Sequence, residues 1–250
     1  MMYSISIIKD NIMSELTPKG TDVVDKKIVW DKAGSRYYET GTSKGVLYPM
    51  TAAGAYGTGV AWNGLTAVTE SPSGAEANDL YADDIKYATL RSAETWGGTI
   101  EAYTYPEEFA ACDGSASPAN VKGVYIGQQK RNGFGFSYVT QVGNDTATES
   151  DDGYKLHIVY GLTASPSEKS YATINDSPDA ITFSWEVSST PVDVAGYKPV
   201  STITIDTTKL DETGKTNLKK LETILYGSGT ADPRLPLPTE VLSTMGQVAA

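Results

Sequence analysis

Short segments rich in β-branched and aromatic residues follow one another from residue 44 to residue 208 and leave few options for the fold. Clusters of Gly, Pro, Ser, Asn and Asp separate them, as is typical of turns between strands. No strand–helix–strand rhythm of a parallel sheet is present. The sequence therefore predicts a mainly β fold of about eight strands, an antiparallel β-sandwich or barrel. The strand-like segments are 44–50, 60–70, 79–90, 95–106, 121–129, 134–143, 154–164, 180–189 and 197–208.

Some of these segments carry signals about how they connect. Residues 60–106 are expected to form three consecutive antiparallel strands. In the second of them, the apolar residues follow two registers, so a bulge or a loop near Asp83 and Asp84 stays open. Asn132-Gly133 is typical of a hairpin turn and predicts that the segments on either side of it pair.

Two helices are expected beside the strands. Residues 106–114 predict a short helix, because Pro106 suits the first turn and Gly114 can end it. Over residues 214–226, leucines recur at helical spacing and Gly227 follows them, which predicts a helix packed on a β core of residues 44–206. The leucines in question are Leu218, Leu221 and Leu225.

Both ends of the chain differ in composition from the middle. Residues 1–43 are polar and mixed and are expected to form an N-terminal arm, of which residues 1–12 are a hypothesised mis-called start before Met13. Residues 232–250, with three prolines in six residues, are expected to form an extended C-terminal arm. The segment 44–231 is then a single β domain, and deletion of 232–250 is expected to leave a folded subunit that cannot assemble.

The balance of residue types argues against several classes of function. The formal net charge of -11 opposes binding of nucleic acid or of an anionic membrane. No apolar run reaches the roughly 18 residues that cross a bilayer. Cys112 is the only cysteine, so no disulfide can form within the chain, which suits assembly in a reducing cytoplasm.

Signals for catalysis or for a cofactor are weak. His157, the only histidine, lies within a predicted strand and is interpreted as a packing residue. With one His and one Cys, a zinc site is nearly excluded. The loop 149–153 resembles a fragment of a calcium loop but lacks its spacing. We therefore expect no metal, no cofactor and no enzymatic activity.

Several segments, taken in order, resemble the major tail protein of bacteriophages with long, non-contractile (siphovirus) tails. They are SPSGAEAN, LYADDIKY, GGTIEAYTYPEEFAACDG, YKLHIVYG, NDSPDAITFSWEVSSTPV and ILYGSGTADPRLPLPTEVL. The resemblance covers residues 44–246 and implies a structural virion protein, the tail tube subunit. Such subunits form hexameric rings that stack into a tube, in which inner strands line the channel, and an N-terminal arm, a long loop and a C-terminal arm bridge subunits and rings.

The resemblance also implies partners. The tube encloses the tape measure protein, meets tail terminator and distal tail proteins at its ends, and lets DNA pass without specific binding. An acidic channel would help the DNA to slide, and the candidate acids for this surface are Asp83, Asp84, Glu101, Glu107 and Glu108. Two alternatives stay open at this point: a phage decoration or adhesin-like β-sandwich module, and a glycan hydrolase with paired carboxylates.

Overall fold

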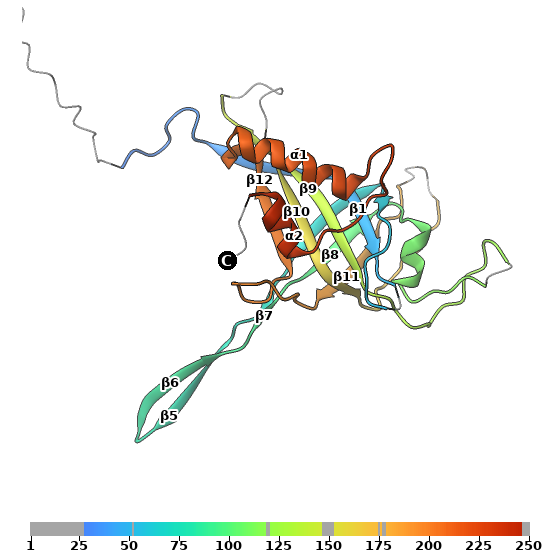
Figure 1. Cartoon of the computed structure of the whole chain (residues 1–250). Coiled ribbons are helices and arrows are strands. Elements are labelled where there is room, and N and C mark those ends of the chain that lie inside the picture. Colours follow the sequence, from blue (N-terminus) through green and yellow to red (C-terminus); the bar gives the residue numbers. More distant parts are fainter. Residues whose placement is uncertain are drawn as a thin grey trace, which may run out of the picture.

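The computed structural model describes residues 28–246 except 52, 119–120, 147–152, 175 and 177–178. The protein is mainly antiparallel β with flanking helices, which confirms the predicted fold class (Figure 1). The strands are β1 (Tyr37–Pro49), β2 (Val60–Trp62), β3 (Leu65–Glu70), β4 (Ser73–Gly74), β5 (Ala77–Ala82), β6 (Ile85–Arg91), β7 (Glu94–Thr95), β8 (Gly97–Ala102), β9 (Phe134–Asn144), β10 (Gly153–Ala164), β11 (Phe183–Ser189) and β12 (Thr202–Asp206). The helices are the 3-10 turns η1 (Glu107–Ala111) and η2 (Thr207–Lys209), and the α-helices α1 (Glu212–Tyr226) and α2 (Pro238–Thr244).

Strand β10 is the centre of the sheet, because it pairs with three other strands. Strand β9 pairs antiparallel with one edge. The other edge is shared: β12 pairs with residues 155–159 and β11 with residues 162–164. Two overlapping sets of strands can therefore be distinguished in the sheet, and both include β1, β9 and β10. One is a path of seven strands, β2-β1-β9-β10-β11-β8-β3, and the other is a four-stranded group, β1-β9-β10-β12.

The path of seven strands curls back on itself, since its two end strands, β2 and β3, are joined by the two residues Asn63 and Gly64. The indole N–H of Trp62 donates a hydrogen bond of 3.0 Å to the Thr104 carbonyl, just beyond β8, and helps to hold this closure. Aromatic side chains at tilted and edge-on angles fill the enclosed space, as is typical of packed rings. They include Trp62, Phe109, Phe134, Phe136 and Trp185.

Helix α1 covers the opposite face of the sheet, as Figure 1 shows. Its predicted apolar positions, Leu218, Leu221 and Leu225, are all buried, and Asp211 caps the helix by accepting a hydrogen bond of 2.7 Å from the Gly214 N–H. Alternate residues of β10 face this helix, as the sequence pattern predicts. They are Leu156, Ile158 and Tyr160.

The prediction of three strands over residues 60–106 is wrong. Residues 77–91 form a separate two-stranded hairpin, β5–β6, that extends away from the sheet (Figure 1). Asp83 and Asp84 form its turn with φ angles of 51° and 60°. Two consecutive positive φ angles are typical of a tight hairpin turn, which usually carries Asn-Gly or Asp-Gly. The Asp-Asp pair lacks that signal, so the sequence could only indicate a bulge or a loop.

The predicted strand 121–129 and its hairpin at Asn132-Gly133 are also wrong. This region has one isolated bridge, between Ala116 and Ile126, and its apolar side chains stay about half exposed. Strand β9 pairs instead with β1 and β10. A β-rich composition alone therefore did not produce a strand here, because none of the described strands pairs with the segment.

Both predicted domain boundaries need correction. At the N-terminal end, residues 37–43 belong to β1 and pair with β9, so the arm cannot extend to residue 43; residues 1–27 lie outside the described chain. At the C-terminal end, residues 232–246 are not an extended arm, because Leu235 and Val241 are buried against the sheet. The Tyr160 hydroxyl donates to the Pro236 carbonyl at 3.0 Å and fixes this segment. Prolines here shape a packed segment that ends in α2.

Candidate assembly surfaces

The four-stranded group ends in two unpaired strand edges. On one side, β2 pairs with β1 only at residues 45–47, and no described strand pairs with this edge at residues 37–43. On the other side, β12 pairs with β10 through residues 202–206, and no described strand pairs with its outer edge. Unpaired edges present rows of N–H and C=O groups that favour pairing with another chain. These two edges are candidate assembly surfaces.

The directions of the strands make the two edges complementary. Each neighbouring pair in the group β1-β9-β10-β12 is antiparallel, so β1 and β12 run in opposite directions. If β1 of one copy lies beside β12 of another, the new pair is antiparallel as well and continues the alternation. The same two edges can be used by every copy, which is a head-to-tail interface.

The face of this group opposite α1 is polar. The ring of His157 stacks on the ring of Tyr138, with centroids 4.5 Å apart, and its Nε2 lies 3.0 Å from the Thr140 hydroxyl. The Lys155 ammonium donates to the Glu39 carboxylate. We call this surface the polar face; its residues are Glu39, Tyr138, Thr140, Lys155, His157, Thr202, Thr204 and Asp206.

Burial and hydrogen bonding determine which groups of the polar face are charged. Burial is the largest influence on His157 and lowers its pKa, against the opposing effect of Glu70 and Glu39. The hydrogen bond from Lys155 is the main reason why the pKa of Glu39 lies below its ordinary value. The Tyr138 hydroxyl donates to Glu70 at 2.6 Å. At neutral pH the face therefore carries a neutral imidazole, paired charges and hydroxyl groups.

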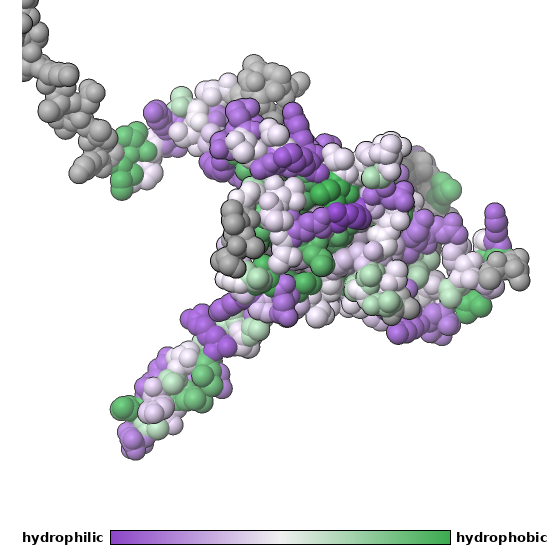
Figure 2. Space-filling model, viewed as in Figure 1, coloured by the Kyte–Doolittle hydropathy of each residue, from purple (hydrophilic) through white to green (hydrophobic). Residues whose placement is uncertain are grey.

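Hairpin β5–β6 is a third candidate surface. Figure 2 shows hydrophobic residues along this projection, which no other described element covers. Tyr81 is 71% exposed, Ile85 63% and Tyr87 74%. The two strands are tied by Asp79, which accepts hydrogen bonds from Lys86 at 2.8 Å and Thr89 at 2.7 Å. An isolated hairpin is marginally stable in water, so exposed apolar residues on it indicate a binding partner.

The structure does not bring the five predicted acids together. Asp83 and Asp84 lie at the tip of the hairpin, Glu101 lies on β8, and Glu107 and Glu108 lie in η1 (Figure 1). The hairpin tip and η1 are at opposite ends of the molecule. Sequence reasoning missed Glu39 and Asp206, which share the polar face although 167 positions of chain separate them.

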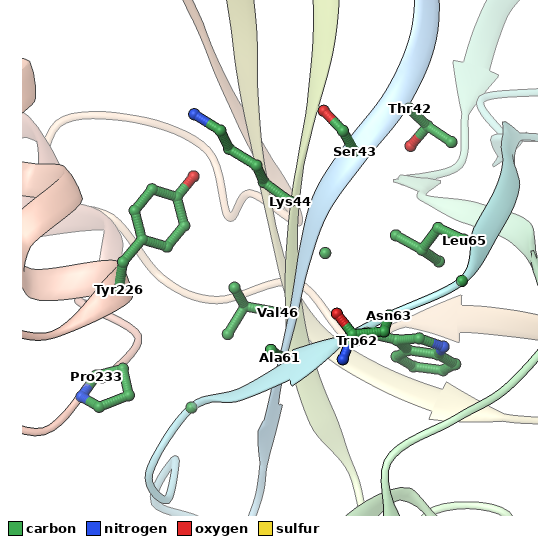
Figure 3. Close-up of a pocket in the computed structure, with 13 residues that line it drawn as sticks. Thr42, Ser43, Lys44, Val46, Ala61, Trp62, Asn63, Leu65, Tyr226 and Pro233 are labelled. Atoms are coloured by element: carbon green, nitrogen blue, oxygen red, sulfur yellow. The ribbon is translucent and has the colours of Figure 1, made fainter.

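A pocket of about 470 Å³ lies where the edge of β1 becomes unpaired. Figure 3 shows Tyr226 and Pro233 on one side of it, β1 residues across the middle, and Leu65 on the other side. Two hydroxyls at this pocket, those of Thr42 and Tyr226, are buried and find no hydrogen-bond partner in the part of the chain that the structure describes. Such groups cost free energy unless another molecule satisfies them.

Chemical groups elsewhere offer little reactivity. Burial raises the pKa of the Cys112 thiol to about 12, which keeps it protonated. In the described part of the chain, no cluster of three or more His, Cys, Asp or Glu residues could hold a metal ion. None of the helices described is both long and apolar enough to cross a membrane.

Comparison with known proteins gives one family. The model of a family described as phage tail tube protein matches residues 36–222, from the start of β1 to the last turns of α1. The match includes both strands whose edges are unpaired and the whole of hairpin β5–β6. None of the curated proteins searched matches the chain.

Proposed function

The chain belongs to the phage tail tube protein family, and we propose that it is the major tail tube subunit of a long, non-contractile tail, which polymerises as stacked hexameric rings around a DNA conduit. Membership of this family makes it a structural virion protein rather than a member of an enzyme family. The observation that carries the finer proposal is the pair of complementary unpaired edges, on β1 and β12.

Ring formation follows from repeated pairing of these edges. Each subunit adds its four strands, β1, β9, β10 and β12, to a barrel that closes when the last β12 meets the first β1. Closure satisfies every edge group and removes the risk of unlimited lateral growth. Helix α1 lies on the outside of this barrel, and the polar face lies on the inside.

The width of the channel is compatible with six subunits. Six copies supply about 24 strands, which at a spacing of about 4.8 Å and a tilt of about 40° give a backbone diameter of roughly 48 Å. Side chains reduce the open width to roughly 38 Å, wide enough for a DNA duplex. Three copies give a backbone diameter of only about 24 Å, which is too narrow.

The polar face suits a surface that must release what passes along it. Its one ammonium, on Lys155, is engaged by Glu39, and its other groups are hydroxyls, the neutral imidazole of His157 and a second carboxylate, on Asp206. Phosphates therefore meet few free cations. This surface would contact the tape measure protein during assembly, in the host cytoplasm, and DNA during ejection.

We assign the contacts between successive rings of the tube to hairpin β5–β6. It extends beyond the sheet, where it can lie on a subunit of the next ring and bury Tyr81, Ile85 and Tyr87. At the two ends of the tube, where there is no next ring, the same surfaces would meet the tail terminator and distal tail proteins.

Electron microscopy of the purified full chain over a range of concentrations tests the proposal. Rings at low concentration and hollow tubes at high concentration are the expected result. A variant in which a two-residue turn replaces residues 75–93 should still fold, because Ser73 and Gly74 already pair with Thr95 and Glu94. This variant should form rings but not tubes, whereas the matched variant Asp84→Gly, with an intact hairpin, should form both. A chain that stays monomeric at every concentration contradicts the proposal.

A further inference from the structure

From the faces of the two unpaired edges we infer the register of the junction: Thr42 of one subunit lies directly opposite Thr202 of the next. The inference rests on the proposed function, since it needs a ring in which β1 meets β12. It goes further by naming which residues of the two edges meet.

Unsatisfied hydroxyls are the first reason. The side-chain oxygens of Thr42 and Thr202 are both buried and have no hydrogen-bond partner among the described residues of the subunit. They belong to β1 and β12, the two strands with unpaired edges. Threonine pairs across neighbouring strands hydrogen-bond to each other. A rotation about χ1 in both residues lets each hydroxyl satisfy the other once the strands pair.

The faces of the strands are the second reason, because paired residues must point to the same side of a sheet. Thr202 lies opposite Val159 on β10, and Val159 belongs to the aromatic core, on the side away from α1. Thr42 also points away from α1, since Figure 3 places it with Leu65, on the side of β1 opposite Tyr226. A one-residue shift would bring opposite faces together and is excluded.

The remaining pairs follow from the bulge in β1. Between Thr40 and Ser43, β1 has one residue more than β9. Gly41 can be that residue, because its φ angle is 65° and a Cβ added to it would meet no atom within 4 Å. With Gly41 unpaired, each remaining residue meets one on its own face. Thr40 lies opposite Ile203, Glu39 opposite Thr204, and Tyr38 opposite Ile205.

The same register places the junction beside the pocket of about 470 Å³, which β1 lines from Thr42 to Val46. The junction ends next to Thr42, because β2 already pairs with Gly45 and Val46. In the neighbouring subunit, the backbone N–H and C=O of Val200 are hydrogen-bonded to Val192 and do not continue the pairing. The neighbour's Ser201 therefore lies at the rim of the pocket.

A disulfide experiment tests the register. Directly opposite residues in an antiparallel pair have Cα atoms about 4.5–5.5 Å apart, within the range that a disulfide bridges. Within one subunit, Thr42 and Thr202 lie on strands separated by β9 and β10, at about 14 Å, which is too far. The only native cysteine, Cys112, is fully buried and should not interfere. The variant T42C/T202C should therefore give, on oxidation of assembled tubes, a ladder of covalent oligomers that reducing agent abolishes.

Matched variants decide between the possible outcomes. T42C/T204C is shifted by two residues on the same face and should stay as single subunits, and an equal mixture of T42C and T202C chains should give covalent dimers only. If T42C/T204C gives the ladder instead, or if neither pair cross-links within tubes seen by electron microscopy, the register is wrong while the tube subunit stands. If the wild-type chain forms no rings or tubes, the proposed function fails and the register fails with it.

Discussion

The phenol of Tyr48 donates a hydrogen bond of 2.8 Å to the backbone carbonyl of Leu225, and this bond joins the buried C-terminal part of β1 to the last turn of α1. The final carbonyls of a helix have no partner within the helix, so this side chain satisfies one of them. Burial accordingly raises the pKa of Tyr48.

Tyr48→Phe should therefore lower the free energy of unfolding by about 1–2 kcal/mol, because it leaves a buried carbonyl without its donor. Urea denaturation followed by tryptophan fluorescence measures the change. Tyr87→Phe is the control, since Tyr87 is 74% exposed on hairpin β5–β6 and should leave the midpoint unchanged. Equal midpoints for Tyr48→Phe and the wild type would show that the bond contributes nothing.

Two glycines with left-handed backbones make a matched pair. A Cβ on Gly161 would lie 2.2 Å from the Thr190 carbonyl oxygen, whereas a Cβ on Gly41 would meet no atom within 4 Å. Their φ angles are similar, 61° and 65°. Gly41→Ala should lower the free energy of unfolding by about 1–2 kcal/mol, because only the left-handed conformation is strained by the added Cβ.

Gly161→Ala should lower the free energy of unfolding clearly more. The backbone must also move at this bend, where the pairing partner of β10 changes from β12 to β11. Thermal unfolding followed by circular dichroism compares the two variants. A larger loss for Gly41→Ala than for Gly161→Ala would mean that the backbone at Gly161 adapts easily.

The C-terminal segment supplies the third prediction. Leu235 is 5% exposed and packs under α1, whereas Leu237, two residues later, is 52% exposed. Leu235→Ala should lower the stability of the isolated subunit by about 2–5 kcal/mol, and Leu237→Ala should change it little.

Deletion of residues 232–250 should destabilise the subunit by at least as much as Leu235→Ala, in contrast to the expectation from the sequence. Urea denaturation at a concentration too low for assembly measures all three variants, and a deletion variant as stable as the wild type would restore the interpretation of this segment as an arm.

Local patterns in the sequence predicted those elements whose burial follows from their own periodicity. The spacing of Leu218, Leu221 and Leu225 predicted the buried stripe of α1, and the alternation in β10 predicted the residues that face it. In both cases one buried face determines the pattern.

Features that depend on distant partners could not be predicted in this way. The pairing of β1 with β9 joins segments about 90 residues apart, and no periodicity encodes which strands become neighbours. The unpaired edges, and with them the candidate assembly surfaces, follow only from that pairing. For the same reason the acids chosen from local sequence are scattered, whereas Glu39 and Asp206 lie on one face.

His157 supplies the last prediction, which concerns pH. The groups that face it are Glu39 from β1, Glu70 from β3, Tyr138 from β9 and Lys155 from its own strand. Burial lowers the pKa of His157 below its ordinary value of 6.5, so the unfolded chain takes up a proton at a higher pH than the folded chain does. Stability contributed by the neutral ring is therefore complete above about pH 6.5 and is lost as the pH falls from there towards the folded pKa.

Urea midpoints of the wild type should consequently decline between about pH 6.5 and 5, and His157→Gln should decline less over that window. Glu39 and Glu70 favour the protonated ring, so Glu39→Gln should make the decline steeper. Below its ordinary pKa of 4.5, Glu39 adds a separate loss, because Lys155 holds its folded pKa lower than that value and protonation favours the unfolded chain. The upper window therefore isolates the histidine, and parallel declines for wild type and His157→Gln would show that the ring is not desolvated enough to influence folding.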